Sequence, residues 1–135
     1  MTSRLNPYLS FTDNARQAME FYREVFGGEL AVNTFGEFGM TESADLVMHS
    51  LLTTDAGFAL MGADTPPGME HRKGSSITVC VNGDDAETLH GYWDKLIEGG
   101  TVETPLEKQM WGDEYGACED RFGIPWMFNI SQPQG

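Results

Sequence analysis

The chain contains two copies of one segment, and this internal repeat constrains its fold more than any other feature. Ala15 and Ala86 are 71 positions apart, and the same separation relates the aromatic pairs Phe21-Tyr22 and Tyr92-Trp93. A Gly-Gly pair follows each copy. A repeat that covers half of a short chain indicates that one supersecondary unit is used twice.

Both copies have the apolar spacing of an amphipathic helix. The apolar positions are 15, 18, 19, 22, 25 and 26 in the first copy and 86, 89, 93, 96 and 97 in the second. Asp84 followed by Glu87 predicts a capping box, and Asp13 is the expected N-cap of the first helix. Each Gly-Gly pair is expected to end its helix.

Short apolar segments predict four strands around each helix. They lie at 8–11, 29–35, 45–53 and 58–61 in the first copy, and at 77–81, 101–107, 114–118 and 126–130 in the second. Turn residues at 54–57 and 120–123 separate the last two strands of each copy. The sequence therefore predicts an α+β fold built from two βαβββ modules.

A chain of 135 residues is long enough for one compact domain that contains both modules. We expect module 1 at about 5–64, a linker over 64–74 and module 2 at about 75–131. The linker is polar and contains Pro and Gly, so it cannot continue a strand. The irregular segment 36–43 is expected to be either a lid over a pocket or a hairpin tip.

Charge and cysteine content exclude several classes of function. The chain has 8 Lys and Arg against 21 Asp and Glu, a net charge of −13, which repels phosphate backbones, so we expect no nucleic-acid partner. No apolar stretch approaches the ~20 residues that span a bilayer, and the amino terminus lacks an apolar secretory segment. We therefore expect no membrane association and a cytoplasmic location. Cys80 and Cys118 are expected to be reduced packing residues.

Six segments, spread over both modules, carry a family resemblance. They are Pro7 to Phe11, Ala18 to Gly28, Val47 to Leu51, Leu60 to Asp64, Met110 to Gly116 and Asp120 to Trp126. With them the chain resembles the vicinal oxygen chelate superfamily, which includes glyoxalase I, bleomycin-resistance proteins and extradiol dioxygenases, and within it the PhnB-like branch. The resemblance implies one domain over 1–135, a glyoxalase/bleomycin-resistance-type open barrel around a cavity, and pairing as a homodimer.

The resemblance also implies a position for a divalent metal on the concave side. Its ligands would be His, Gln or Glu on the first strand of each module and Glu on the last strand. Period-two alternation places Asn6, Met61, Ser76 and Met127 approximately at these positions. These side chains are poor ligands for a hard divalent ion, which prefers carboxylate oxygen or imidazole nitrogen. We therefore expect no metal at this site, and no cofactor.

Aromatic and methionine side chains are expected on or near the concave side instead. The expected ligand-binding residues are Tyr8, Phe38, Met61, Trp111, Tyr115 and Met127. Polarizable, adaptable walls of this kind suit a small organic molecule. The alternative is that some of them close a dimer interface. Four further aromatics are assigned to packing between helix and sheet: Phe21, Tyr22, Trp93 and Trp126.

The three histidines receive different assignments. His49 lies in an apolar strand and is the candidate general base, because an imidazole ionises near pH ~6.5. The alternative is a hydrogen-bonded strand histidine with no chemical role. His71 in the linker and His90 on the second helix are expected to be exposed and without function.

Three functions remain open from the sequence. The first is metal-independent binding of a small organic molecule in the cavity between the modules. The second is a metal-dependent lyase or dioxygenase whose displaced ligand set includes His49. The third is a drug-sequestering dimer of the bleomycin-resistance kind, favoured by the acidic charge and the aromatic walls. Whether the protein is an enzyme is left open.

Overall fold

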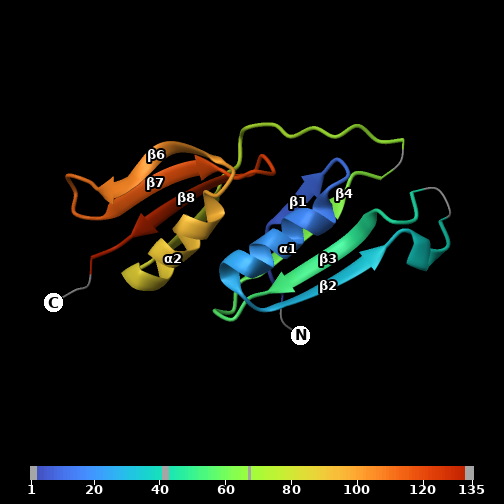
Figure 1. Ribbon diagram of the computed structural model, residues 1–135, viewed down its shortest axis with the longest axis horizontal. Coiled ribbons are helices and arrows are strands. Elements are labelled where there is room, and N and C mark those ends of the chain that lie inside the picture. The colour runs from blue at the N-terminus through green and yellow to red at the C-terminus, as the bar shows by residue number, and fades with distance from the viewer. Residues whose placement is uncertain (1–2, 41–42, 67, 133–135) are drawn as a thin grey trace. The chain divides into compact units, whose positions relative to one another are not determined.

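A computed structural model describes residues 3–40, 43–66 and 68–132. Two compact units divide the chain after Lys73. Each unit contains one long helix and one four-stranded mixed sheet (Figure 1). The predicted α+β class and the repeated βαβββ order are therefore confirmed. No helix in the described ranges is both long and apolar enough to cross a bilayer.

The first unit follows the predicted order closely. Its elements are β1 (Tyr8–Phe11), α1 (Ala15–Phe26), β2 (Glu29–Thr34), the short 3-10 helix η1 (Gly36–Phe38), β3 (Val47–Thr53) and β4 (Ala59–Asp64). The strand order is β1-β4-β3-β2, in which β1 runs parallel to β4 and the other pairs are antiparallel. β1 is thus an edge strand. The chain passes from β1 through α1, β2 and β3 before it forms β4, the neighbour of β1 in the sheet.

The second unit repeats this topology. Its elements are β5 (Val79–Gly83), α2 (Ala86–Leu96), β6 (Thr101–Lys108), β7 (Glu114–Glu119) and β8 (Pro125–Ile130). The strand order is β5-β8-β7-β6, again with one parallel pair, β5 with β8. The two sheets have the same strand order and strand directions, as two copies of one sequence segment predict.

Each helix buries its apolar stripe against one face of its own sheet, as period 3.6 on the helix and period 2 on the strands require. In the second unit the rings of Trp93 and Phe128 meet edge to face, with centroids 5.3 Å apart. The four aromatics assigned to this packing, Phe21, Tyr22, Trp93 and Trp126, are all buried. The opposite face of each sheet is left uncovered by its helix.

The predicted helix caps are wrong. Asn14 and Asp85 occupy the N-cap positions, and neither side chain caps the backbone. At α1 the backbone N–H of Ala15 donates instead to the Asp64 carboxylate, at 2.9 Å. A carboxylate that is distant in sequence but adjacent in space satisfies the donor that a local cap would have taken.

The start of the second module also differs from expectation. β5 begins at Val79 rather than at position 77, and the side chain of Ile77 is 80% exposed. Cys118 is buried as predicted, but Cys80 is exposed, so its assignment as a packing residue is wrong. Cys80 lies on an edge strand, and its side chain points to the face that α2 does not cover, because its neighbour Val81 takes the buried position.

Candidate functional site

The open face of the first sheet, the face that α1 leaves uncovered, brings three predicted site residues together. Tyr8 on β1 is the register partner of Met61 on β4, and His49 lies on the next strand, β3. The Tyr8 hydroxyl is 3.4 Å from Nδ1 of His49, and the two rings stack at 29° with centroids 5.9 Å apart. Tyr8, His49 and Met61 therefore form one continuous wall.

Asn6 extends this wall at the entry to β1. Its amide Nδ2 lies 4.0 Å from the Met61 sulfur, at the distance of a weak hydrogen bond to a thioether. The two side chains that occupy the expected metal positions of module 1 thus contact each other. One presents an amide and the other a soft sulfur.

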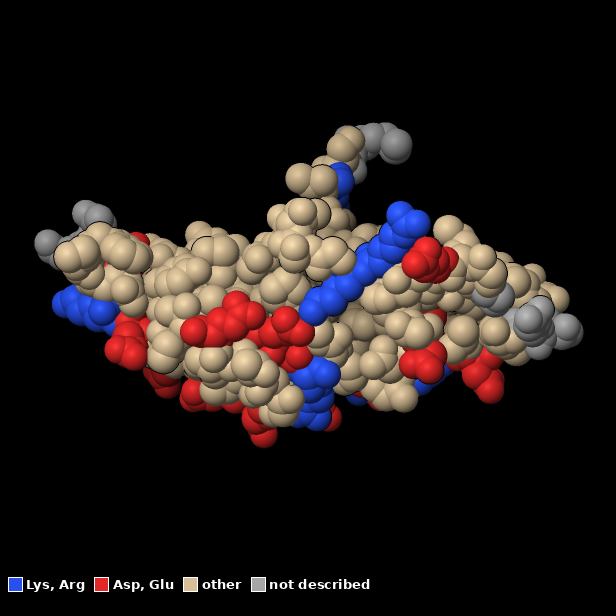
Figure 2. Space-filling model, turned by 90° about the horizontal axis from the view of Figure 1, so that it is seen from above, with Lys and Arg blue, Asp and Glu red and all other residues tan. Residues whose placement is uncertain are grey.

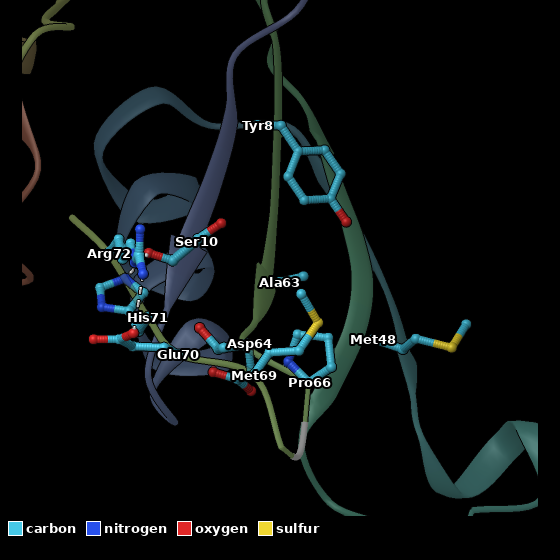
Figure 3. Close-up of a pocket in the computed structure, with 11 residues that line it drawn as sticks. Tyr8, Ser10, Met48, Ala63, Asp64, Pro66, Met69, Glu70, His71 and Arg72 are labelled. Atoms are coloured by element: carbon cyan, nitrogen blue, oxygen red, sulfur yellow. Dashed lines mark hydrogen bonds and ion pairs between the residues drawn. The ribbon is translucent and has the colours of Figure 1, made fainter. Parts of the chain in front are cut away.

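A pocket of about 370 Å³ adjoins the open face, and all of its lining residues belong to the first unit. Strands β1 and β4 contribute Tyr8, Ser10, Ala63 and Asp64, and the linker contributes the opposite wall. In Figure 3, Arg72, His71 and Glu70 gather beside Ser10, while Tyr8 lies at the far end. The linker is therefore part of the site.

Hydrogen bonds at two points hold the linker against β1. The backbone N–H and the hydroxyl of Thr65 both donate to the Phe11 carbonyl oxygen, at 2.7 and 2.9 Å. At the other end, Nε2 of His71 lies 3.0 Å from the Ser10 carbonyl oxygen. A carbonyl only accepts, so Nε2 of His71 carries the proton. The described residues between these points, 66 and 68–70, are therefore flanked on both sides by hydrogen bonds to β1.

The expectation that His71 is merely exposed is wrong, because its side chain is partly buried in this arrangement. The spacing of apolar residues cannot predict such a contact, because the linker has no regular structure and Ser10 is far from His71 in the sequence. The one local hint is composition: His71 opens the run His71-Arg72-Lys73, which holds the chain's sole pair of adjacent Lys or Arg residues.

Asp64 joins three segments of the first unit at the base of the pocket. Its side chain is buried, and its two oxygens accept hydrogen bonds from the backbone N–H groups of Ala15, at 2.9 Å, and Val47, at 2.8 Å. One carboxylate thus ties together the start of α1, the start of β3 and the end of β4. Its charge is stabilised by two N–H donors, one of them at a helix N-terminus.

The other predicted ligand-binding residues lie elsewhere. Phe38 is 60% exposed on η1, where Glu37 accepts a hydrogen bond from the backbone N–H of Thr34, at 2.8 Å. Trp111 is 62% exposed in the turn between β6 and β7. Neither residue lines the pocket of the first unit.

Tyr115 and Met127 share the open face of the second sheet, the face away from α2. Tyr115 pairs with Asn129, and Met127 pairs with Ala117 on one side and Cys80 on the other. The two site residues are therefore diagonal neighbours on adjacent strands, consistent with their expected position on one face.

His90 is also better connected than expected. Its Nε2 lies 3.0 Å from a carboxylate oxygen of Glu114, which joins α2 to the start of β7, and the His90 side chain is only partly exposed. This pair lies outside the open face and is a contact within the second unit.

The side chains present do not fit the divalent metal that the family resemblance implies. Met61 and Met127 offer thioethers, and the Asn6 amide is directed to Met61. Ser76 lies at a bend before β5, so Cys80 rather than Ser76 faces Met127 across the strands. Among the residues that the structure describes, no three His, Cys, Asp or Glu side chains gather as a metal site.

The negative charge is unevenly distributed. Figure 2 shows one face, on which acidic side chains are interspersed with a few Lys or Arg side chains and with uncharged areas. Because surface potential depends on local charge as well as on the net charge of −13, an acidic protein can still present a neutral or weakly basic site.

Comparison with known proteins decides the family. The model of the Glyoxalase/Bleomycin resistance protein/Dioxygenase superfamily matches residues 4–128. The chain belongs to this superfamily. Protein YjdN of Escherichia coli (strain K12) is 26% identical over 96% of this chain and 97% of its own length. The resemblance stated from the sequence motifs is therefore confirmed.

Solved structures agree with this assignment. Protein PA1353 from Pseudomonas aeruginosa is 32% identical, with a TM-score of 0.87 over 98% of this chain and all of the other (100%). A PhnB protein from Bacillus cereus is 20% identical, with a TM-score of 0.76 over 96% of this chain and 100% of its own. At that identity the second similarity shows the fold alone, and it places a PhnB protein among the structural neighbours.

Proposed function

We propose that this superfamily member binds a small organic molecule on the open face of its first module, without a divalent metal. The single observation that supports this best is the wall of Tyr8, His49 and Met61 beside a pocket of about 370 Å³. Of these three side chains only Tyr8 lines the pocket itself, and His49 and Met61 lie beside it on the same sheet face. Together they offer apolar contact and a few polar atoms next to the pocket, as is usual at ligand sites.

The size of the pocket supports a small ligand over a bulky one. A volume of about 370 Å³ lies near the lower end of the ~300–1,000 Å³ range of small-molecule sites. A metabolite with one ring or a short chain fits such a space, whereas a large cationic drug would need far more. This weighs against the drug-sequestering alternative.

If the bound molecule is turned over, His49 is the residue we propose as general base. Nδ1 of its imidazole lies 3.4 Å from the Tyr8 hydroxyl. When Nδ1–H donates to the phenol oxygen, the ring is held in place and Nε2 carries no proton, so Nε2 can accept a proton from the ligand. This role needs no metal.

Two further parts of the proposal come from the sequence. Trp111, Tyr115 and Met127 are proposed to bind a ligand within module 2, separately from the pocket of the first module. A homodimer in the cytoplasm is the proposed state of the protein, and its two free cysteines suit a reducing compartment.

A thermal-shift screen with uncharged and charged metabolites tests ligand binding. Hits should lose their stabilising effect in Tyr8→Ala and His49→Ala and keep it in His90→Ala, a matched histidine away from the open face. Hits that act equally on all three variants would place the ligand elsewhere and overturn the proposal.

Equilibrium dialysis against Zn, Ni, Mn and Fe tests the metal-free part. We expect no stoichiometric binding by the purified protein. Tight binding that is lost in Met61→Ala or Met127→Ala would contradict the proposal. Binding lost in His49→Ala would favour a metal-dependent lyase or dioxygenase with a displaced ligand set.

A further inference from the structure

The pocket collects basic groups in a protein that has few. Arg72 and His71 line it, and the sequence contains 8 Lys and Arg in all against 21 Asp and Glu. Both residues lie on the linker loop and face Ser10 of β1 across the entrance (Figure 3). A cation at this point can attract an anionic group that the rest of the surface repels.

One acidic residue of the lining, Asp64, already uses both carboxylate oxygens in hydrogen bonds within the fold. Its two oxygens accept the Ala15 and Val47 N–H groups, at 2.9 and 2.8 Å. The start of α1 adds its partial positive charge at the same place. Asp64 is therefore occupied with holding the fold and opposes an incoming anion less than a free carboxylate would.

The other acidic residue, Glu70, is the partner of Arg72. A guanidinium nitrogen of Arg72 lies 3.3 Å from a Glu70 carboxylate oxygen, and the two side chains are 83% and 75% exposed. Ion pairs this exposed contribute little to stability, so Glu70 is held in place only weakly. The carboxylate of Glu70 is thus an exchangeable partner of the guanidinium.

We propose that the pocket binds a small molecule bearing a carboxylate, that Arg72 binds this carboxylate, and that Glu70 occupies the same position in the free protein. The planar guanidinium matches a carboxylate in two parallel hydrogen bonds. This inference rests on the proposed function and names the chemical class of its ligand.

The remainder of the pocket supports an organic body attached to that carboxylate. Ala63, Pro66 and Met69 provide an apolar base, and the Met69 thioether points toward Ala63 in Figure 3. The Tyr8 hydroxyl at the far end can donate to a polar substituent. A ligand with a carboxylate at one end and a ring or short chain behind it meets all of these groups.

The experiment compares benzoate with benzamide, two probes of equal shape that differ in charge, by NMR titration of the full chain in a buffer without carboxylates or phosphate. Benzoate should bind about tenfold more tightly than benzamide, as one charge-assisted pair predicts. Arg72→Gln should abolish this preference and leave benzamide binding unchanged. Glu70→Gln should strengthen benzoate binding by removing the competing carboxylate.

Lys73→Gln is the matched control, because it removes the same charge from the neighbouring residue, which does not line the pocket. It should retain most of the preference for benzoate. Equal binding of both probes, or an equal effect of Arg72→Gln and Lys73→Gln, would overturn the inference and leave the proposed function standing. Failure of both probes to shift resonances of pocket residues would overturn both. Arg72 is exposed, so its substitution is not expected to disturb folding.

Discussion

At the scale of single residues, one buried carboxylate in each unit accepts several hydrogen bonds that fix the structure around it, and in the first unit it takes the place of the expected helix cap. Asp64 accepts two backbone N–H groups in the first unit. Asp120 accepts the N–H groups of Phe122 and Ile124 and the indole N–H of Trp126 in the second. Both residues are buried. Asp64 joins segments that are distant in sequence, whereas Asp120 holds the turn between β7 and β8 and the first residues of β8.

Asp64→Asn should lower the free energy of unfolding by about 2–4 kcal/mol. The amide has one oxygen that can accept a hydrogen bond. Its NH₂ group would face the second backbone N–H donor, which would then have no acceptor. Urea unfolding measures the effect, and Asp45→Asn, at an exposed position, is the control and should change little. Equal midpoints for Asp64→Asn and the parent protein would contradict the role given to this carboxylate.

The two cysteines should differ in reactivity. Burial, with help from the Asp120 and Glu103 carboxylates, raises the pKa of Cys118 to about 11. Partial desolvation also raises the pKa of Cys80, but its side chain is exposed. Iodoacetamide at pH 8 should therefore label Cys80 slowly and leave Cys118 unlabelled until the protein is unfolded. Mass spectrometry of the two peptides measures this, and equal labelling in the folded state would refute it.

The same shift has a consequence for stability. The thiol of Cys118 has a higher pKa in the folded state than its ordinary value of 9.0, so the folded state disfavours the thiolate. The stability that the neutral Cys118 thiol contributes is fully present below pH 9 and is lost as the pH rises through about 11. The Cys118→Ala variant should lack this part of the alkaline loss.

At the scale of elements, the end of α1 depends on glycine for a steric reason. Gly28 follows α1 with a φ of +110°, and a Cβ there would overlap the Thr53 carbonyl oxygen and lie 2.6 Å from the Thr54 Cα. Backbone atoms cannot move aside as a flexible side chain can. The tight passage from α1 into β2 therefore exists because residue 28 has no side chain.

Gly28→Ala should be more destabilising than Gly57→Ala. Gly57 also has a positive φ, of +91°, but nothing lies within 4 Å of a Cβ built there. Gly57→Ala should cost about 1–2 kcal/mol of conformational strain, and Gly28→Ala several kcal/mol, because a clash is added to the strain. Thermal or urea unfolding of both variants measures the difference, and equal losses would show that the clash relaxes freely.

At the scale of the whole molecule, a segment without regular structure joins the two compact units along the chain. Residues 71–78 contain no helix or strand, and Arg72 and Lys73 are exposed within them. Limited trypsin digestion should therefore cut after Arg72 or Lys73 before it cuts at Lys or Arg residues inside helices and strands. The products should correspond to the two units, and Arg72→Gln with Lys73→Gln should remove this cleavage. Faster cleavage at Lys95, inside α2, would contradict the division.

Much of the fold was predictable from the sequence because its signals are local. Period 3.6 and period 2 place the helices and most strands, and both predicted turns close as expected, with Gly57 donating to Thr54 and Gly123 to Asp120. The family resemblance adds the topology. β5 was misplaced because Ile77 is apolar yet exposed, so apolar character alone does not show which side chains the sheet buries.

The candidate site, like the fold, was predictable from the sequence only in part. Alternation along the strands was enough to put Tyr8 and Met61 on one face, because side chains on a strand point alternately to opposite sides. His49 was chosen only from its place in an apolar strand. Only the tertiary structure decided that Asp64 binds the start of α1, and that the linker returns to β1 through His71 and brings Arg72 to the pocket. Such contacts join residues with no shared period, and their free energy depends on which polar groups become neighbours once the chain is folded.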